Sequence, residues 1–162
     1  MLPEDLAGME TVASLETLDP AAITGGELSH GESTLWIRCE KIVSVCRFLR
    51  DERNYERISG LTAIDRYPIE PRFEVVYLLH SVSRNERLRL KVALPGDAAE
   101  IESVTSVWPG ADWYERETFD LFGIHFTNHP NLKRIMMPEN WEGHPLRKDF
   151  PTHGHRYSYP SE

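Results

Sequence analysis

The chain has 162 residues, of which 40% are apolar and 27% are charged, and it carries a formal net charge of −8. This length and composition suit one globular domain with a hydrophobic core, and they exclude a collagen, a disulfide-stapled mini-protein and a long disordered chain. The acidic charge is concentrated in residues 1–32, which hold seven acids and no Lys or Arg, so residues 33–162 are nearly neutral. Because the chain has no basic excess, a nucleic-acid partner is not expected.

Two targeting features are missing from the sequence. No run of 18 apolar residues occurs, so we do not expect the chain to span a membrane on its own. The N-terminus, from Met1 to Asp5, lacks the basic and apolar regions of a secretory signal. The sequence therefore predicts a cytoplasmic location.

The first half of the chain alternates between strand and helix patterns. Residues 1–20 form an acidic segment with weak helical character, for which we expect a loosely attached arm or a short helix. Residues 21–123 are expected to form the folded domain, starting with two short strands at 21–30 and 33–38. Apolar side chains at positions i, i+3, i+4 and i+7 then predict an amphipathic helix at 40–51.

Three further strands are predicted, at residues 58–66, 73–83 and 87–94. The second is almost wholly apolar, which indicates a central strand covered on both faces. The third alternates leucine and valine with a basic stripe of Arg87, Arg89 and Lys91. This stripe is either a solvated face or a surface that docks against an acidic partner or the acidic arm. The element order predicts an α+β fold: a two-layer domain with a mostly antiparallel or mixed five-stranded sheet.

A last helix is predicted from Trp113 to Phe122. Asp112, with Glu115 three residues on, resembles a capping box at its start, and Gly123 suits its end. Apolar residues wrap around most of this helix, so one domain face cannot easily cover them all. We therefore favour an interface helix over the alternative, a core helix with one charged face.

Charged side chains on the same helix are placed among aromatic residues. Arg116 and Asp120 are four residues apart, so they are predicted to pair on one face with Glu117. Glu115 falls between Phe119 and Phe122, where a carboxylate is costly to bury unless a cation or a hydrogen-bond donor reaches it. No nucleophile or activated histidine accompanies these carboxylates, so no catalytic residue is predicted.

Residues 124–162 are broken by prolines and predict an extended C-terminal segment that a surface outside the chain would order. No cofactor motif is visible, and two cysteines cannot hold an iron–sulfur cluster unaided. A metal site is not favoured either, because the late histidines lack the spacing of a zinc site on an ordered hairpin or helix. A small metal-dependent enzyme stays open as an alternative, using His125, His129, His144, His153 and His155.

Several stretches of the sequence resemble one family, the 30 kDa subunit of respiratory complex I, which in bacteria is the C-type component of NADH-quinone oxidoreductase. The main stretch runs from Glu115 to Phe122 and continues through His129, Lys133 and Ile135-Met136. Further similar stretches are Pro71–Tyr77, Ser106–Ala111 and Glu142–Pro151, in the same order along the chain. The resemblance covers about residues 30–151, and it leaves residues 1–20 and 152–162 unmatched.

The resemblance implies a non-redox structural subunit in the peripheral arm of the proton-translocating NADH:quinone oxidoreductase. Its partners would be the quinone-site subunit of the 49 kDa type and the iron–sulfur subunits of the complex. FMN, the iron–sulfur clusters and quinone would be held by partner subunits, with no cofactor or metal in this chain. The chain would reach the cytoplasmic side of the cell membrane only through the complex. The equivalent subunit of a hydrogenase-type complex is an alternative.

The resemblance also implies a partner interface formed by the last helix and the C-terminal segment. Polar and apolar anchors on and around the helix would be joined by an extended docking segment. The predicted interface residues are Trp108, Trp113, Glu115, Arg116, Glu117, Asp120, Phe122, His129, His144, Pro145, Leu146, Arg147, Lys148, Asp149 and Phe150.

Overall fold

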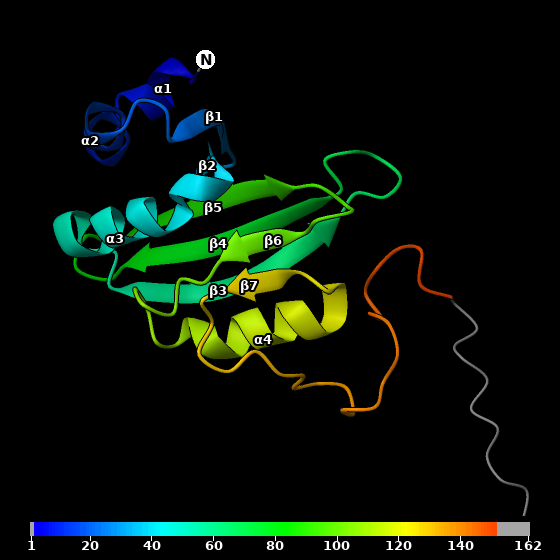
Figure 1. The fold of residues 1–162 in the computed structure, drawn as a ribbon. Coiled ribbons are helices and arrows are strands. Elements are labelled where there is room, and N and C mark those ends of the chain that lie inside the picture. The colour runs from blue at the N-terminus through cyan, green and yellow to red at the C-terminus, as the bar shows by residue number, and fades with distance from the viewer. Residues whose placement is uncertain (1, 152–162) are drawn as a thin grey trace, which may run out of the picture.

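The fold is an α+β domain, seen in a computed structural model that describes residues 2–151 (Figure 1). Two N-terminal helices precede a five-stranded sheet with one helix between its strands, and a further helix with two short strands follows. In chain order the elements are α1 (Glu4–Ala7), α2 (Glu10–Leu18), β1 (Ile23–Ser29), β2 (Glu32–Ile37), a 3-10 turn (Cys39–Lys41), α3 (Ile42–Arg53), β3 (Arg57–Asp65), β4 (Phe73–Ser81), β5 (Glu86–Leu94), β6 (Glu100–Glu102), α4 (Ala111–Phe122) and β7 (His125–Thr127).

The main sheet has the strand order β1-β2-β5-β4-β3. Neighbouring strands are antiparallel except for β2 and β5, which are parallel and pair Leu35 with Leu90. The parallel pair needs a long crossover, and α3, β3 and β4 supply it. The sequence-based prediction of an α+β fold with a mixed five-stranded sheet is confirmed.

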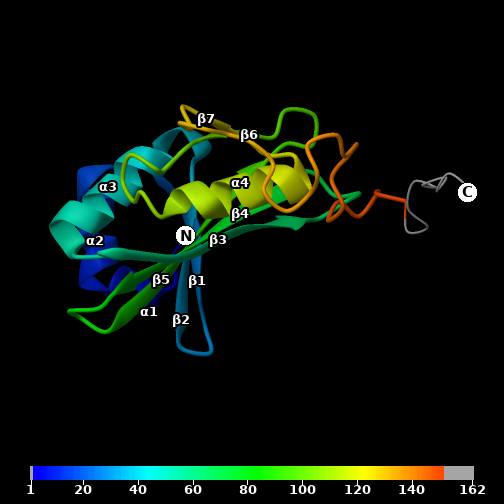
Figure 2. The ribbon, with the colours of Figure 1, turned by 90° about the horizontal axis from the view of Figure 1, so that it is seen from below.

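The two faces of the sheet differ in what covers them. Alternate side chains, such as Phe73, Tyr77 and Leu90, are buried on the inner face, against which α3 and α4 pack (Figure 2). The opposite face, which we call the outer face, carries Trp36 and the basic side chains of β5. No helix within residues 2–151 lies over it. Strand β4 is nonetheless central, and it is buried on both faces from Phe73 to Tyr77, as the sequence predicts, whereas Leu78 and His80 leave the outer face partly open further along the strand.

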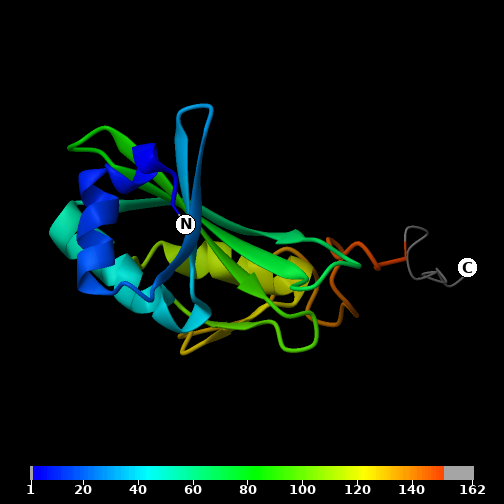
Figure 3. The same ribbon diagram turned by 90° about the horizontal axis from the view of Figure 1, so that it is seen from above.

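The N-terminal segment is packed into the core instead of forming a loose arm. Leu6, Val12 and Leu15 have no exposed surface, and they join the core that α3 shares. In Figure 3 the two helices lie beside β1 and α3 at one end of the molecule. Of the two expectations for residues 1–20, the short helix is therefore the better one. The weak helical pattern of the sequence did not reveal that three apolar side chains anchor this acidic segment in the core.

Two strands were not predicted from the sequence. Strands β6 and β7 form a separate parallel pair in which Ile101 lies opposite Phe126. Each strand has three residues, too few to show an alternating pattern, and their pairing joins segments on either side of α4. None of the helices in residues 2–151 has the length and apolar character needed to cross a membrane.

Candidate partner-binding surface

Helix α4 lies along β3 at the edge of the sheet, and its two ends are built differently. At its start Gly110 takes the N-cap position and no side chain caps the helix, so the predicted capping box of Asp112 and Glu115 is wrong. At its end Gly123 adopts φ 74°, and its N–H donates to the Phe119 carbonyl over 2.8 Å. The prediction that Gly123 ends the helix is confirmed, because this left-handed conformation suits glycine.

Glu115 is buried on the inner side of α4 without any exposed surface. Its carboxylate accepts a hydrogen bond from the Ser103 hydroxyl at 2.6 Å and one from the Val104 N–H at 2.8 Å. His129 Nε2 lies 3.8 Å away. Burial raises the pKa of Glu115 to about 7, and the two hydrogen bonds only partly offset this shift. The carboxylate thus attaches α4 to the loop that precedes it, without capping the helix.

Asp120, one turn later on α4, is equally buried and far better bound. One carboxylate oxygen accepts the backbone N–H groups of Ile135, Met136 and Met137 at 3.0, 2.8 and 2.8 Å. The other oxygen lies 2.5 Å from Arg134 Nη1. Burial alone would raise the pKa of Asp120, but the hydrogen bonds from Met137 and Arg134 outweigh it and lower the pKa.

The predicted ion pair between Arg116 and Asp120 does not form. Arg116 instead stacks over the Trp113 ring, 5.3 Å from its centre. Its guanidinium donates to the carbonyls of Lys133 and Arg134 at 3.2 and 3.4 Å. The pair is absent because the three successive N–H groups and Arg134 already fill the acceptor sites of Asp120. Both side chains therefore attach the same segment to α4, but separately.

Residues 144–147 complete the C-terminal end of α4. The last carbonyls of a helix have no partner within it. Here His144 Nδ1 lies 2.9 Å from the Asp120 carbonyl, and the Leu146 N–H donates to the Leu121 carbonyl at 3.0 Å. Arg147 donates to the Phe122 carbonyl at 2.5 Å. The cationic side chain of Arg147 also suits the negative end of the helix dipole.

A second anchor joins the C-terminal segment to the sheet. Arg72 donates to Asp65 at 2.9 Å through two nitrogens and to Asp149 at 2.7 and 3.0 Å. The Lys148 N–H also reaches Asp65, over 2.8 Å. The hydrogen bonds to Asp65 and Asp149 raise the pKa of the Arg72 guanidinium. Burial alone would raise the pKa of Asp65, but the hydrogen bonds that its carboxylate accepts lower this pKa to about 2. The sequence predicts an external surface that orders this segment, yet residues 144–150 bind their own chain.

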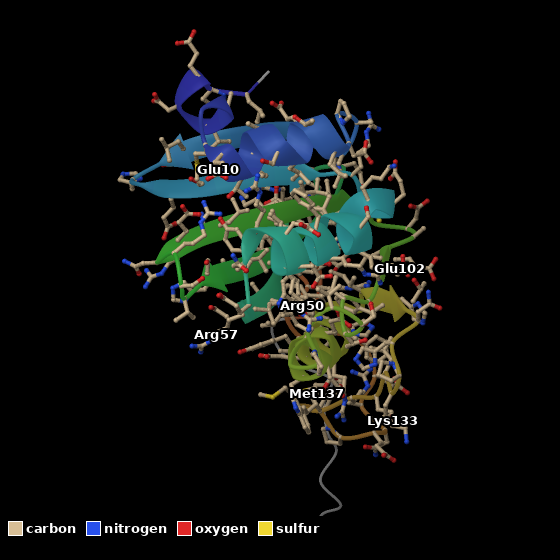
Figure 4. All side chains as sticks on the ribbon, turned by 90° about the vertical axis from the view of Figure 1, so that its left-hand side faces the viewer. Glu10, Arg50, Arg57, Glu102, Lys133 and Met137 are labelled. Carbon is tan, nitrogen blue, oxygen red and sulfur yellow. The ribbon has the colours of Figure 1, made fainter. Side chains whose placement is uncertain are left out.

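Large apolar side chains remain exposed around α4. Trp113 and Met136 are 61% and 62% exposed, and Leu146 is 52% exposed. Ile135 adjoins Met136 and is more covered. We call Trp113, Ile135, Met136 and Leu146 the α4 face. In Figure 4 the labelled Lys133 and Met137 mark the end of the molecule that α4 and its following segment form. Apolar residues grouped on a surface and rimmed by Arg116 and Arg134 are typical of protein interfaces.

The structure divides the predicted interface residues into two groups. One group is bound within the chain: Trp108, Glu115, Asp120 and Phe122 are buried, and the His129 side chain is fully covered. The Trp108 indole N–H, for example, donates to the Tyr55 carbonyl at 3.1 Å. The other group is partly or largely open to solvent: Trp113, Arg116, Glu117, His144, Pro145, Leu146, Arg147, Lys148, Asp149 and Phe150. An interface role stays a prediction for both groups.

The late histidines are dispersed over the structure. His125 Nδ1 lies 3.2 Å from Glu100, His129 is buried beside Asp112, and His144 binds the end of α4. Within residues 2–151 no group of three or more His, Cys, Asp or Glu side chains is arranged to hold a metal ion. His153 and His155 lie outside the described residues.

Two arginines that hold the site together were not singled out from the sequence. Arg134 binds Asp120 from a segment without regular structure, so no helical spacing could reveal the pair. Arg72 and Asp149 are far apart in sequence, and only the folded chain shows that they meet. Arg72 and Asp149 each lie in a stretch of the sequence that resembles the family. That resemblance was the one sign in the sequence that these two residues matter.

The sequence matches the profile of the family described as respiratory-chain NADH dehydrogenase, 30 kDa subunit, over residues 35–156. It is 49% identical over 142 residues to the C-type component of NADH-quinone oxidoreductase from Roseiflexus castenholzii, covering 86% of this chain and 82% of that protein. It is 47% identical over 126 residues to the component of the same name from Geobacter sulfurreducens, covering 77% of this chain and 78% of that protein.

Solved structures agree with this family match. A trypsin-resistant fragment of Nqo5 superposes with a TM-score of 0.66 and 26% identity, covering 76% of this chain and all of the fragment. A chain in the archaeal membrane-bound sulfane sulfur reductase, a respiratory membrane complex, superposes with a TM-score of 0.76 and 27% identity, covering 88% of this chain and 85% of that one. The fold therefore occurs in more than one kind of respiratory complex.

Proposed function

This chain belongs to the family of 30 kDa subunits of respiratory-chain NADH dehydrogenase, and from that premise we propose that it acts as a non-redox structural subunit that docks through the α4 face. It is a subunit of NADH-quinone oxidoreductase, as its relatives are. The single observation that carries the docking proposal is the group of exposed apolar side chains around α4, headed by Trp113 and Met136.

The construction of this surface supports a docking role. The segment that carries Ile135 and Met136 is fixed by the Asp120 carboxylate, and Leu146 is fixed by a hydrogen bond to the end of α4. A partner would therefore meet apolar side chains that are already positioned, and little free energy would be needed to order them. Tryptophan and arginine side chains, here Trp113 and Arg116, contribute strongly to many protein interfaces.

The proposed partner is the quinone-site subunit of the complex, with the iron–sulfur subunits nearby. These partners would hold the quinone and the clusters, and FMN would be bound elsewhere in the complex. This chain would lie on the cytoplasmic side of the membrane and be attached through the complex alone. The hydrogenase-type alternative is less supported, because the relatives with 46–50% identity all carry the name of the same NADH-quinone oxidoreductase component.

Deletion and complementation would test the proposal. Membranes of a strain lacking the chain should lose NADH:quinone reductase activity and the assembled complex, and an affinity-tagged copy should restore both and copurify with the other subunits from detergent extracts. Flavin-dependent NADH oxidation with a soluble artificial acceptor would serve as a control for the NADH-oxidising part. Recovery of the tagged chain only as a free monomer, with the complex intact without it, would contradict the proposal.

A further inference from the structure

The outer face of the main sheet holds a row of two arginines with a histidine between them, and the docking role of the α4 face does not use these residues. Arg57 on β3 lies directly opposite His80 on β4, which lies directly opposite Arg87 on β5. The two arginines are therefore two strands apart on the same face, with the His80 side chain between them.

The two arginines of this row have no anionic partner in the part of the chain that the structure describes. Elsewhere on the same face the bases are neutralised, since Arg89 pairs with Glu32, and Lys91 pairs with Glu74 at 3.2 Å. Neither Arg57 nor Arg87 makes such a contact within residues 2–151. The unpaired positive charge is therefore confined to one end of the sheet.

The row borders a hollow of about 460 Å³ in the surface. Arg57, His80, Arg87 and Arg89 line it, and Leu78, which is 38% exposed, supplies an apolar side chain between them. In Figure 4 Arg57 projects on the opposite side of the molecule from Glu102 of β6.

We propose that this hollow is a second docking site, which receives an acidic segment of a partner protein. Carboxylate side chains of that segment would pair with Arg57 and Arg87, and an apolar side chain beside them would cover Leu78. The charge complementarity is specific, because an arginine fork binds a carboxylate through two parallel hydrogen bonds. The inference rests on the proposed function only in that the chain is part of a larger complex.

Two other occupants fit the structure less well. The acidic N-terminal segment of the same chain packs on the inner side of the sheet, and its Glu10 is bound to Arg53 at 2.8 Å. Anionic lipid surfaces are bound by clusters of about four to eight Lys and Arg side chains. Arg57 and Arg87 are too few for such a cluster. Two arginines in a hollow suit a pair of carboxylates on one peptide segment.

Zero-length cross-linking in the intact complex tests the proposal. Arg87→Lys keeps the charge and supplies an amine that a carbodiimide couples only to a carboxylate in direct contact. The complex carrying this variant would be purified, cross-linked and mapped by mass spectrometry. Arg47→Lys, an exposed and equally unpaired position on α3, is the matched control. If the complex that carries the variant chain can be purified, the chain is a subunit as proposed. The absence of a cross-link would then count against this docking site and not against the proposed function.

We expect residue 87 to couple to an Asp or Glu of another subunit, at least tenfold more often than residue 47 does. The double variant Arg57→Glu/Arg87→Glu should then abolish contact with that segment while the full chain keeps its melting temperature. Coupling only to Glu32 of the same chain, or to nothing, would overturn the proposal. So would binding of the full chain to vesicles of equal parts phosphatidylcholine and phosphatidylglycerol that is lost in the double variant.

Discussion

Glu115 and Asp120 are two carboxylates on one helix, and neither has exposed surface. Their pKa values are nevertheless shifted in opposite directions. Glu115 accepts two hydrogen bonds from neutral donors, and burial raises its pKa to about 7. Asp120 accepts three backbone N–H bonds and a charged arginine bond, and its pKa is lowered although burial acts against this. Burial raises the pKa of both carboxyl groups, and the number and charge of the hydrogen-bond donors decide whether that effect is overcome.

The difference matches what each residue holds in place. Glu115 joins α4 to the loop before it, and that loop is also fixed by the β6–β7 pair. Asp120 fixes a segment with no regular structure, which positions half of the α4 face. Loss of Asp120 should therefore have larger consequences than loss of Glu115.

The largest effect is expected for Asp120→Ala. The substitution leaves the Arg134 guanidinium and three backbone N–H groups without their acceptor, and breaking a buried pair in this way costs about 3–5 kcal/mol. Urea unfolding of the full chain would measure the loss. Glu117→Ala on the same helix, where the side chain is exposed, is the control and should change stability by less than about 0.5 kcal/mol. Equal effects would show that Asp120 is not an anchor.

The next effect is a pH dependence with opposite signs for the two carboxylates. A raised folded-state pKa means that Glu115 favours the folded state at acidic pH, and this contribution is lost as the pH rises through about 7. Asp120 has a lowered pKa, so its contribution is lost as the pH falls below its usual titration range. Of these two carboxylates, only Glu115 titrates near neutral pH.

Glu115→Gln should therefore flatten the stability profile between about pH 5 and pH 8. The difference in unfolding free energy between wild type and variant should change by about 2–3 kcal/mol across this range, given about 1.4 kcal/mol for each pKa unit. Denaturant titrations at a series of pH values would record it, with Glu117→Gln as the control. An unchanged slope in Glu115→Gln would mean that the carboxylate is ionised throughout.

A smaller effect is expected at the end of α4. Gly123→Ala places a Cβ where φ is 74° and within 2.5 Å of His144 and Arg147 side-chain atoms. We expect a loss of about 1–2 kcal/mol in unfolding free energy. Gly110→Ala, with ordinary φ and no atom within 4 Å of the new Cβ, should be almost neutral. Equal losses at both positions would contradict the assigned role of residues 144–147.

Much of the fold could be predicted from the sequence because local patterns determine it. The helix expected at 40–51 forms as α3 at Ile42–Arg53, and the strict alternation of β5 marks its buried side correctly. Short elements such as β6 and β7 carry too few residues for any pattern. The packing of α1 and α2 depends on contacts with β1 and α3, which no local signal specifies.

The helix that carries the candidate site could be predicted from the sequence, but the contacts around it could not. The sequence correctly placed Glu115, Arg116 and Asp120 on one helix, α4. It wrongly paired Arg116 with Asp120, because spacing on one helix ignores the competing donors from 134–137. The contacts of Arg72 and Arg147 join residues distant in sequence, so only the folded chain reveals that the C-terminal segment is attached to its own domain.

The central claim is that the buried carboxylates build the α4 face and that the exposed apolar residues do the docking. The most direct test is the variant Trp113→Glu/Met136→Glu, measured for both stability and incorporation into the complex. The account predicts a change of less than about 0.5 kcal/mol in unfolding free energy and at least a tenfold loss of copurifying subunits. Leu18→Glu/Leu28→Glu, at apolar residues exposed elsewhere, is the matched control and should assemble normally. Normal incorporation of the Trp113→Glu/Met136→Glu variant would contradict the account.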